Sequence, residues 1–167
     1  RNRRPIKGTE EYVECDTLLL SVGLIPENEL STSLGIEMDP ITGGPVVSEN
    51  RETSQKGVFA CGNVLHVHDL VDYVTLESQL AGEGAAKYIK DMEEERAFVV
   101  TKGMDGVRYV VPQKININTD KDVKIYFRVG QVYKNAKVFI ENDEEIILSR
   151  RKPKFTPGEM EDITIKN

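Results

Sequence analysis

The spacing of apolar residues changes near Arg96, and this change constrains the fold more than any other feature of the chain. Before it, apolar residues recur at helical intervals, which predicts one long helix over residues 75–95 with Thr75 as its N-cap. The apolar positions are Leu76, Leu80, Ala81, Ala85, Tyr88, Ile89 and Met92. Beyond it, short runs predict strands at residues 107–111, 123–129, 136–140, 145–148 and 163–165. The second part is therefore predicted to be a small antiparallel β-sandwich.

The segment before the helix is rich in turn residues and predicts short strands. The predicted elements are a hairpin over 6–15 that turns at Gly8, a strand over 16–22 covered on both faces, a hairpin formed by 36–38 and 46–47, and a buried strand over 58–61 that ends at Gly62. Strands followed by a long helix indicate an α/β arrangement for this first part.

Composition excludes several classes of function. The chain has 167 residues and a net charge of -6, which argues against nucleic-acid binding. We expect no membrane span, because no apolar run approaches the roughly 20 residues that a bilayer requires. Cys15 and Cys61 belong to no CxxC motif, which favours a reducing, cytoplasmic setting. The chain opens with Arg1 rather than Met, and we interpret it as a fragment.

Three ordered motifs lie within about residues 10–92. The first is a strand and Gly-x-x-Pro turn, residues 15–28, and the second is the stretch 53–63, in which Thr53 is followed by a polar link, an apolar run and Gly62-Asn63. The third is the small-residue helix segment 81–86. Together they resemble the FAD domain of the pyridine-nucleotide-dependent flavoprotein oxidoreductases. The resemblance implies the C-terminal part of a flavoprotein fold with two dinucleotide-binding domains, followed by the β-sandwich.

The resemblance also implies a division of the chain and a set of cofactor contacts. Residues 1–22 would be the end of the NAD domain and the return strand, 23–95 the C-terminal part of the FAD domain, and 96–167 the β-rich domain. Gly62 would make room for the cofactor, and Asn63 would bond the ribityl chain of FAD, where the family has Asp. The amides of Thr75, Leu76 and Glu77 would face the flavin ring, where a helix N-terminus stabilises the negative charge of the reduced form.

The segment after Asn63 holds both histidines of the chain, His66 and His68, beside Asp69 and Asp72. These atoms suit zinc or iron, but the sequence shows no further cluster of ligands, so we assign no metal. The alternatives are an enlarged loop beside the flavin that shapes a pocket or carries protons, and a loop with a purely structural role.

The expected chemistry of the longer parent is hydride transfer between NAD(P)H, FAD and a small substrate. No residue in the chain is a convincing acid, base or nucleophile, so the catalytic residues stay unknown. The glycine motifs that cradle FAD and NAD are absent from this sequence, so the isolated chain is expected to be inactive and free of FAD.

A narrower resemblance, based on residues 61–74 and on the β-rich tail, is to the NAD(FAD)-dependent dehydrogenases associated with anaerobic glycerol-3-phosphate dehydrogenase and to the large subunits of sarcosine and opine oxidases. The alternative function is an interaction module, in which the β-rich domain docks a partner oxidoreductase subunit or a second copy.

Overall fold

The computed structural model describes residues 5–20, 23–90, 96–143 and 145–167. Its elements are α1 (Glu29–Ser33), a 3-10 helix (Gly62–Val64), α2 (Val71–Lys90), β1 (Phe98–Val100), β2 (Val107–Val111), β3 (Lys114–Asn116), β4 (Val123–Val129), β5 (Tyr133–Glu141), β6 (Ile146–Phe155) and β7 (Glu161–Ile165). The described helices all precede Arg96 and the described strands all follow it, so the change of apolar spacing marks a real change of secondary structure. No helix in the described ranges is both long and apolar enough to cross a membrane.

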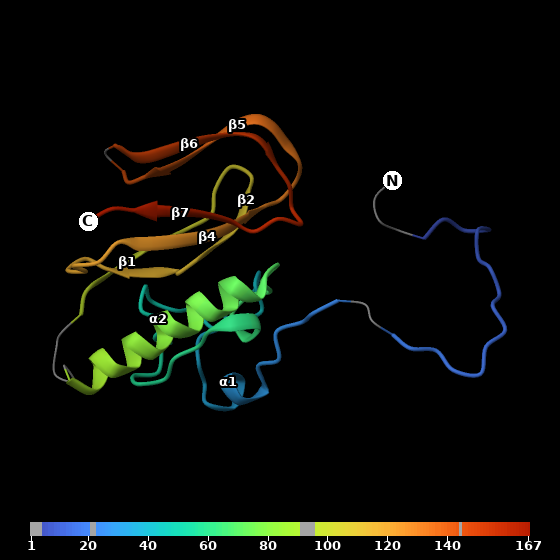
Figure 1. The fold of residues 1–167 in the computed structure, drawn as a ribbon, viewed down its shortest axis with the longest axis horizontal. Helices are drawn as coiled ribbons and strands as arrows, with labels where there is room; N and C mark the ends of the chain where they lie inside the picture. Colours follow the sequence, from blue (N-terminus) through green and yellow to red (C-terminus); the bar gives the residue numbers. More distant parts are fainter. Residues whose placement is uncertain (1–4, 21–22, 91–95, 144) are drawn as a thin grey trace.

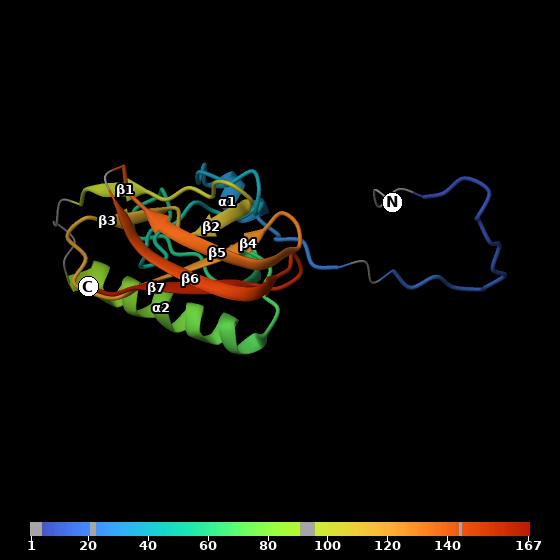
Figure 2. The same ribbon diagram turned by 90° about the horizontal axis from the view of Figure 1, so that it is seen from above.

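The strands form three antiparallel sheets. β4 lies between β2 and β7, β5 pairs with β6, and β1 pairs with β3. The predicted strands 107–111 and 123–129 are confirmed, and the other three lie within or overlap β5, β6 and β7. The sequence did not predict the short strands β1 and β3. Figures 1 and 2 show the β5–β6 hairpin lying over the three-stranded sheet.

β4 is buried on both sides and separates two groups of side chains. On one side Val123, Ile125, Phe127 and Val129 face the hairpin and form the main apolar core with Phe155 and Ile163. On the other side the buried Tyr126 ring lies near two histidine rings, with its centroid 5.9 Å from that of His66 and 6.2 Å from that of His68. This strand therefore links the β-rich part to the loops that precede α2.

A second apolar cluster contains residues from both parts of the chain. Val47, Ala60 and Leu65 pack in it with Tyr109 and Val111 of β2. The carbonyl of Val47 accepts from the backbone N–H groups of Gln113 and Lys114, both at 3.1 Å, and the Gln113 side chain accepts from the Val47 N–H at 3.1 Å. The predicted boundaries at residues 22 and 95 stay predictions, and this cluster spans the second of them.

The helix begins earlier than its sequence predicted. α2 starts at Val71, and the Thr75 hydroxyl donates to the Val71 carbonyl at 3.2 Å, as an interior helical threonine does. The N-cap assignment of Thr75 is therefore wrong. Asp72 lies in the first turn, where a carboxylate is favoured. The predicted end at residue 95 falls in 91–95, which lie outside the described residues.

The first segment departs most from its prediction. Residues 5–20 contain a turn at Gly8, whose φ is +83°, but neither the hairpin arms of 6–15 nor the start of the strand 16–22 is formed. Residues 21–22 lie outside the described residues. Leu19 is 89% exposed, because the described residues provide no neighbouring strand to pair with it and no side chains to cover it. The hairpin 36–47 and the strand 58–61 are reduced to single bridges, Met38 with Pro45 and Glu52 with Phe59.

Candidate functional site

Glu77 is the centre of a buried polar cluster that joins α2 to the loops before it. Its side chain is inaccessible to solvent. Its Oε1 accepts from Arg51 Nε at 3.0 Å and lies 3.3 Å from His66 Nε2. Its Oε2 accepts from the Gly62 backbone N–H at 2.8 Å and lies 2.8 Å from His68 Nε2. We refer to these five residues as the Glu77 cluster. An ionised carboxylate only accepts hydrogen bonds, so both imidazoles present an N–H at Nε2.

Local backbone structure directs these groups toward Glu77. Gly62 has a φ of +72°, a conformation that favours glycine, and it begins the 3-10 helix. The Asn63 side chain accepts from the His68 backbone N–H at 3.1 Å, which holds the histidine segment in a turn. Arg51 has a φ of +67° in a turn closed by its N–H to the Ser48 carbonyl at 2.9 Å. Two segments, residues 48–51 and 62–68, are therefore fixed around one carboxylate.

The charges of Arg51 and Glu77 balance within the cluster. Burial by itself would raise the pKa of Glu77, but the hydrogen bonds from His66 and His68 and the Arg51 guanidinium outweigh it and hold that pKa well below its ordinary value. Burial lowers the pKa of His66 more than its bond to Glu77 raises it. The cluster at neutral pH is thus an Arg51–Glu77 ion pair with a neutral His66.

The sequence predicts no metal site because it shows no further cluster of ligands beyond the histidine segment, but the structure supplies such a cluster. His66, His68 and Glu77 place potential ligand atoms within 4.8 Å of one another. Asp69 lies elsewhere, bonded to Arg128 and to the Met160 N–H. A dication here would lie beside the Arg51 guanidinium, and with Glu77 the local charge would be about +2, which burial makes unfavourable. The donor set is therefore better suited to hydrogen bonding than to a metal.

The cluster has a consequence for stability against pH. Unfolded histidine has a pKa of about 6.5, and the pKa of folded His66 is lower. Between these values the unfolded chain binds more protons, so the free energy of unfolding is expected to fall as pH drops from 7.5 to 5.5. His66→Gln is expected to remove up to about 1.4 kcal/mol per pH unit of this slope. Urea unfolding at several pH values measures it, and equal slopes in both proteins would contradict the assignment.

The predicted cofactor residues are divided between the interior and the surface. Gly62 and Glu77 meet in the Glu77 cluster, whereas the side chains of Asn63, Thr75 and Leu76 are exposed. A Cβ on Gly62 would approach Val74 Cγ1 to 3.3 Å, so the glycine meets α2. Because α2 starts at Val71, the free amides belong to its first turn and those of residues 75–77 lie inside the helix. Their contact with a flavin stays a prediction.

The structure offers a partial fit to FAD. The exposed Asn63 amide is of the type that bonds a ribityl hydroxyl, and Asn63 is the middle residue of the 3-10 helix that packs on α2. Exposed apolar side chains in the same segments are Val64, Leu70, Val71 and Leu76. This combination suits the ring and ribityl end of the cofactor.

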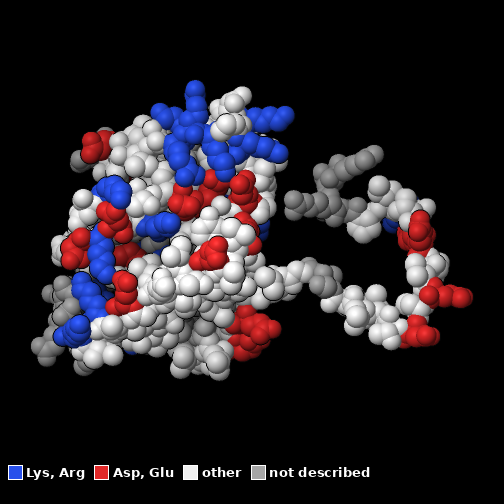
Figure 3. Space-filling view, in the orientation of Figure 1, with Lys and Arg blue, Asp and Glu red and all other residues white. Residues whose placement is uncertain are grey.

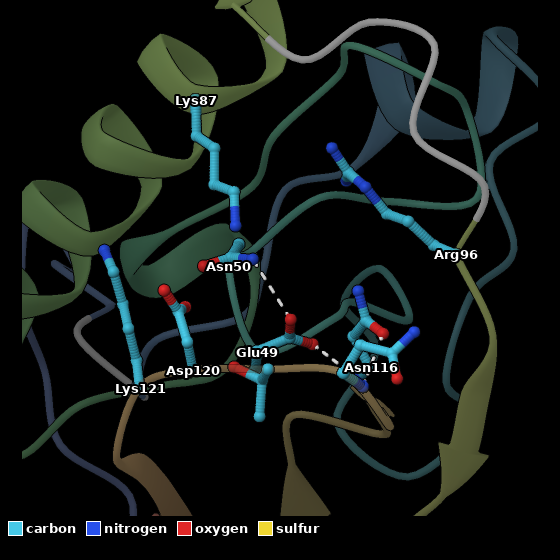
Figure 4. A pocket seen from close by; sticks show the side chains of 9 residues that line it. Glu49, Asn50, Lys87, Arg96, Asn116, Asp120 and Lys121 are labelled. Atoms are coloured by element: carbon cyan, nitrogen blue, oxygen red, sulfur yellow. Dashed lines mark hydrogen bonds between the residues drawn. The ribbon is translucent and has the colours of Figure 1, made fainter.

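A polar hollow lies elsewhere, between the C-terminal half of α2 and the loop after β3 (Figure 4). Glu49 lines it and accepts from Asn50 Nδ2 at 3.0 Å and from the Asn116 N–H at 2.9 Å. Lys87, Arg96 and Lys121 also line it. Neither the predicted cofactor residues nor the members of the Glu77 cluster contribute to the lining.

Comparison with known proteins gives one family and several relatives. The family profile described as pyridine nucleotide-disulphide oxidoreductase matches residues 2–86. Thioredoxin reductases of Listeria monocytogenes and Listeria innocua are each 33% identical to the chain over 91 residues. The aligned region is 53% of this chain and 28% of each relative, so the chain spans well under half of their length. No solved structure matches it significantly.

Proposed function

The chain belongs to the pyridine nucleotide-disulphide oxidoreductase family, and on that premise we propose that it is part of an FAD-dependent enzyme that transfers hydride between NAD(P)H, FAD and a small substrate. The main support is that the matched region, residues 2–86, contains Gly62-Asn63, the histidine segment and most of α2. The hydrogen bond from the Gly62 N–H to Glu77 holds the end of this motif against α2.

The chain's own residues would hold one end of the cofactor. Asn63 would bond a ribityl hydroxyl, and the free amides at the start of α2 would face the flavin ring. FAD, when bound, supplies the hydride chemistry. The Arg51–Glu77 pair would act as a positioning element, because it fixes Gly62 and the histidine segment on which Asn63 depends. The glycine cradle for the pyrophosphate is absent from this sequence, so the 167-residue chain alone would not retain FAD.

The narrower proposal concerns the substrate. The residues 61–74 and the β-rich tail support a member resembling the dehydrogenases associated with anaerobic glycerol-3-phosphate dehydrogenase and the sarcosine and opine oxidase large subunits. The Listeria relatives, which are named as thioredoxin reductases, instead favour a protein disulfide as the substrate. Both described cysteines are free, which supports a cytoplasmic setting under either proposal.

The test uses the full-length protein that carries this chain. It is expected to purify with FAD and to show loss of flavin absorbance when NADH or NADPH is added without oxygen. Asn63→Leu is expected to weaken FAD binding about fivefold, the equivalent of one hydrogen bond of about 1 kcal/mol. Asn63→Asp keeps the acceptor for the His68 N–H and should retain FAD. The FAD dissociation constant, measured by flavin fluorescence, provides the comparison.

The matched control is Asn118→Leu, a change at an exposed asparagine outside the proposed contact. Equal FAD affinity in the Asn63→Leu and Asn118→Leu proteins would rule out the proposed contact between Asn63 and the ribityl chain. Absence of flavin from the full-length protein would overturn the function itself. Stoichiometric FAD on the isolated 167-residue chain would show that the cradle is not required. The two substrate proposals are separated by activity assays of the full-length protein. Oxidation of a 2-hydroxy or amine substrate supports the first, and reduction of a protein disulfide supports the second.

A further inference from the structure

The outer face of the β5–β6 hairpin carries a gradient of charge. In this register Lys134 lies opposite Lys154 and Lys137 opposite Arg151, at the end where Tyr133 pairs with Phe155. The other end turns through Glu141, Asp143 and Glu145, all exposed. Figure 3 shows the result along the hairpin in the upper part of the view: acidic at the turn, uncharged in the middle and basic at the far end.

The basic end is unfavourable in an isolated chain. Like charges directly opposite each other on neighbouring strands destabilise a sheet. The ion pairs among the described residues engage Arg150 and Lys152, which bond Glu161 on the inner side, but include none of the four outer-face cations. Such a cluster is stabilised when an acidic surface is brought against it.

An apolar patch separates the two charged ends. Phe139 of β5 and Ile147 of β6 are 45% and 47% exposed, and Ile147 lies at the register shift between the two strands. Phe139 is opposite Ser149 in the register, and Lys137 Nζ lies 5.0 Å from the centroid of its ring. Aromatic and aliphatic side chains at the centre of a charged rim are typical of a protein–protein contact.

The arrangement is complementary to itself. Lys137 and Glu141 lie two residues on either side of Phe139, so each is about 6.6 Å from it along the strand. If two hairpins face each other in opposite directions about a twofold axis at Phe139, Lys137 and Arg151 of one copy meet Glu141 and Glu145 of the other. We propose that this outer face is the contact surface for a second copy of the chain, with Phe139 packed at the axis and Ile147 beside it toward the turn.

Other anionic partners are less well matched. A membrane surface or a nucleic acid presents negative charge along its whole length and would repel the acidic turn at Glu141. A second copy satisfies both ends at once. The outer face also lies on the opposite side of the molecule from α2 (Figure 1), so the contact leaves Asn63 and the start of α2 accessible. The inference therefore does not depend on the proposed flavin chemistry.

The test is a charge exchange between two variants of the 167-residue chain. K137E/R151E makes the two positions beside Phe139 at the basic end acidic, and E141K/E145K makes the two positions at the turn basic, while Lys134, Lys154 and Asp143 stay unchanged in both. The unmodified chain is expected to show a concentration-dependent dimer in sedimentation velocity that weakens as salt rises. Each variant alone is expected to lose at least tenfold in its association constant. An equimolar mixture of the two variants should form a heterodimer. When one variant carries an affinity tag, the untagged variant should then elute with it.

The controls address folding and other routes of association. K137E/R151E keeps a like-charge pair across the strands, so its circular dichroism and unfolding midpoint should stay close to those of the parent. Lys56→Glu, an exposed change on a distant loop, should leave the association constant unchanged. Self-association through exposed leucines such as Leu19 would not respond to charge exchange. A mixture with no more dimer than its components, or a parent that is monomeric at all concentrations, would overturn the proposal.

Discussion

Glu77→Gln is expected to lower the free energy of unfolding by about 3–5 kcal/mol, the cost of leaving one member of a buried ion pair unpaired. The substitution keeps the size of the side chain, so the loss arises from charge and hydrogen bonding. The Arg51 guanidinium would remain fully buried with no carboxylate, and a new amide donor would face the N–H groups of the cluster. Urea unfolding at pH 7 measures the change.

The matched control is Glu83→Gln on the same helix, where the carboxylate is 66% exposed and pairs with Lys121 at the surface. That change should cost less than about 1 kcal/mol. Adding Arg51→Met to Glu77→Gln should recover part of the loss, because no uncompensated charge remains. The carboxylate's contribution should also decline below about pH 4.5, since the pKa of folded Glu77 is depressed and only the unfolded chain then takes up the proton. Similar losses in both single variants would show that the cluster is not a buried ion pair.

Two glycines of α2 are expected to respond to alanine with opposite signs. A Cβ on Gly84 would lie 2.4 Å from the Asn50 carbonyl oxygen and 3.1 Å from Phe59 Cε1, so the helix would have to move. Gly84→Ala should therefore lose about 1–3 kcal/mol. A Cβ on Gly82 would meet nothing within 4 Å, and Gly82→Ala should gain about 0.5–1 kcal/mol of helix propensity.

The pair is its own control, since both changes add the same methyl group to the same helix. Thermal or urea unfolding of the two variants gives the comparison. A stabilised Gly84→Ala protein would mean that the close approach of α2 to residues 50 and 59 is absent in solution. Of the two glycines in the small-residue segment 81–86, only Gly84 makes a close approach among the described contacts.

The elements predicted best are those whose own residues determine them. β2 and β4 follow from local runs of β-branched and aromatic residues. The run 16–22 has a similar composition but forms no strand in its described part, because a strand needs neighbours that sequence composition does not supply. The sequence places the start of α2 too late, because Thr75 has the residue type of an N-cap, whereas Leu70, which directly precedes the helix, does not.

The Glu77 cluster was missed, although the sequence contained a signal for it. Glu77, Ala81 and Gly84 are the buried positions of α2, at intervals of four and three residues. An acidic residue on the same helix face as two small buried residues is itself buried and requires hydrogen-bond donors. The chain has two histidines, and both lie within eleven residues of Glu77. The partner Arg51 could not be found in this way, because its approach depends on a turn with positive φ.

Val47 lies in the first half of the chain but bonds to and packs against the β-rich tail, which limits how the two halves can be recombined with other proteins. Val47 gives its N–H and its carbonyl to residues 113 and 114 and packs against Tyr109 and Val111. The β-rich tail therefore supplies part of the interior on which the residues around Gly62 rest. If a recombinant protein replaced this tail with an unrelated domain, Val47, Ala60 and Leu65 would lose their packing partners and become exposed to solvent. The tail and the half that carries the Gly62-Asn63 motif therefore have to be kept together in any chimera.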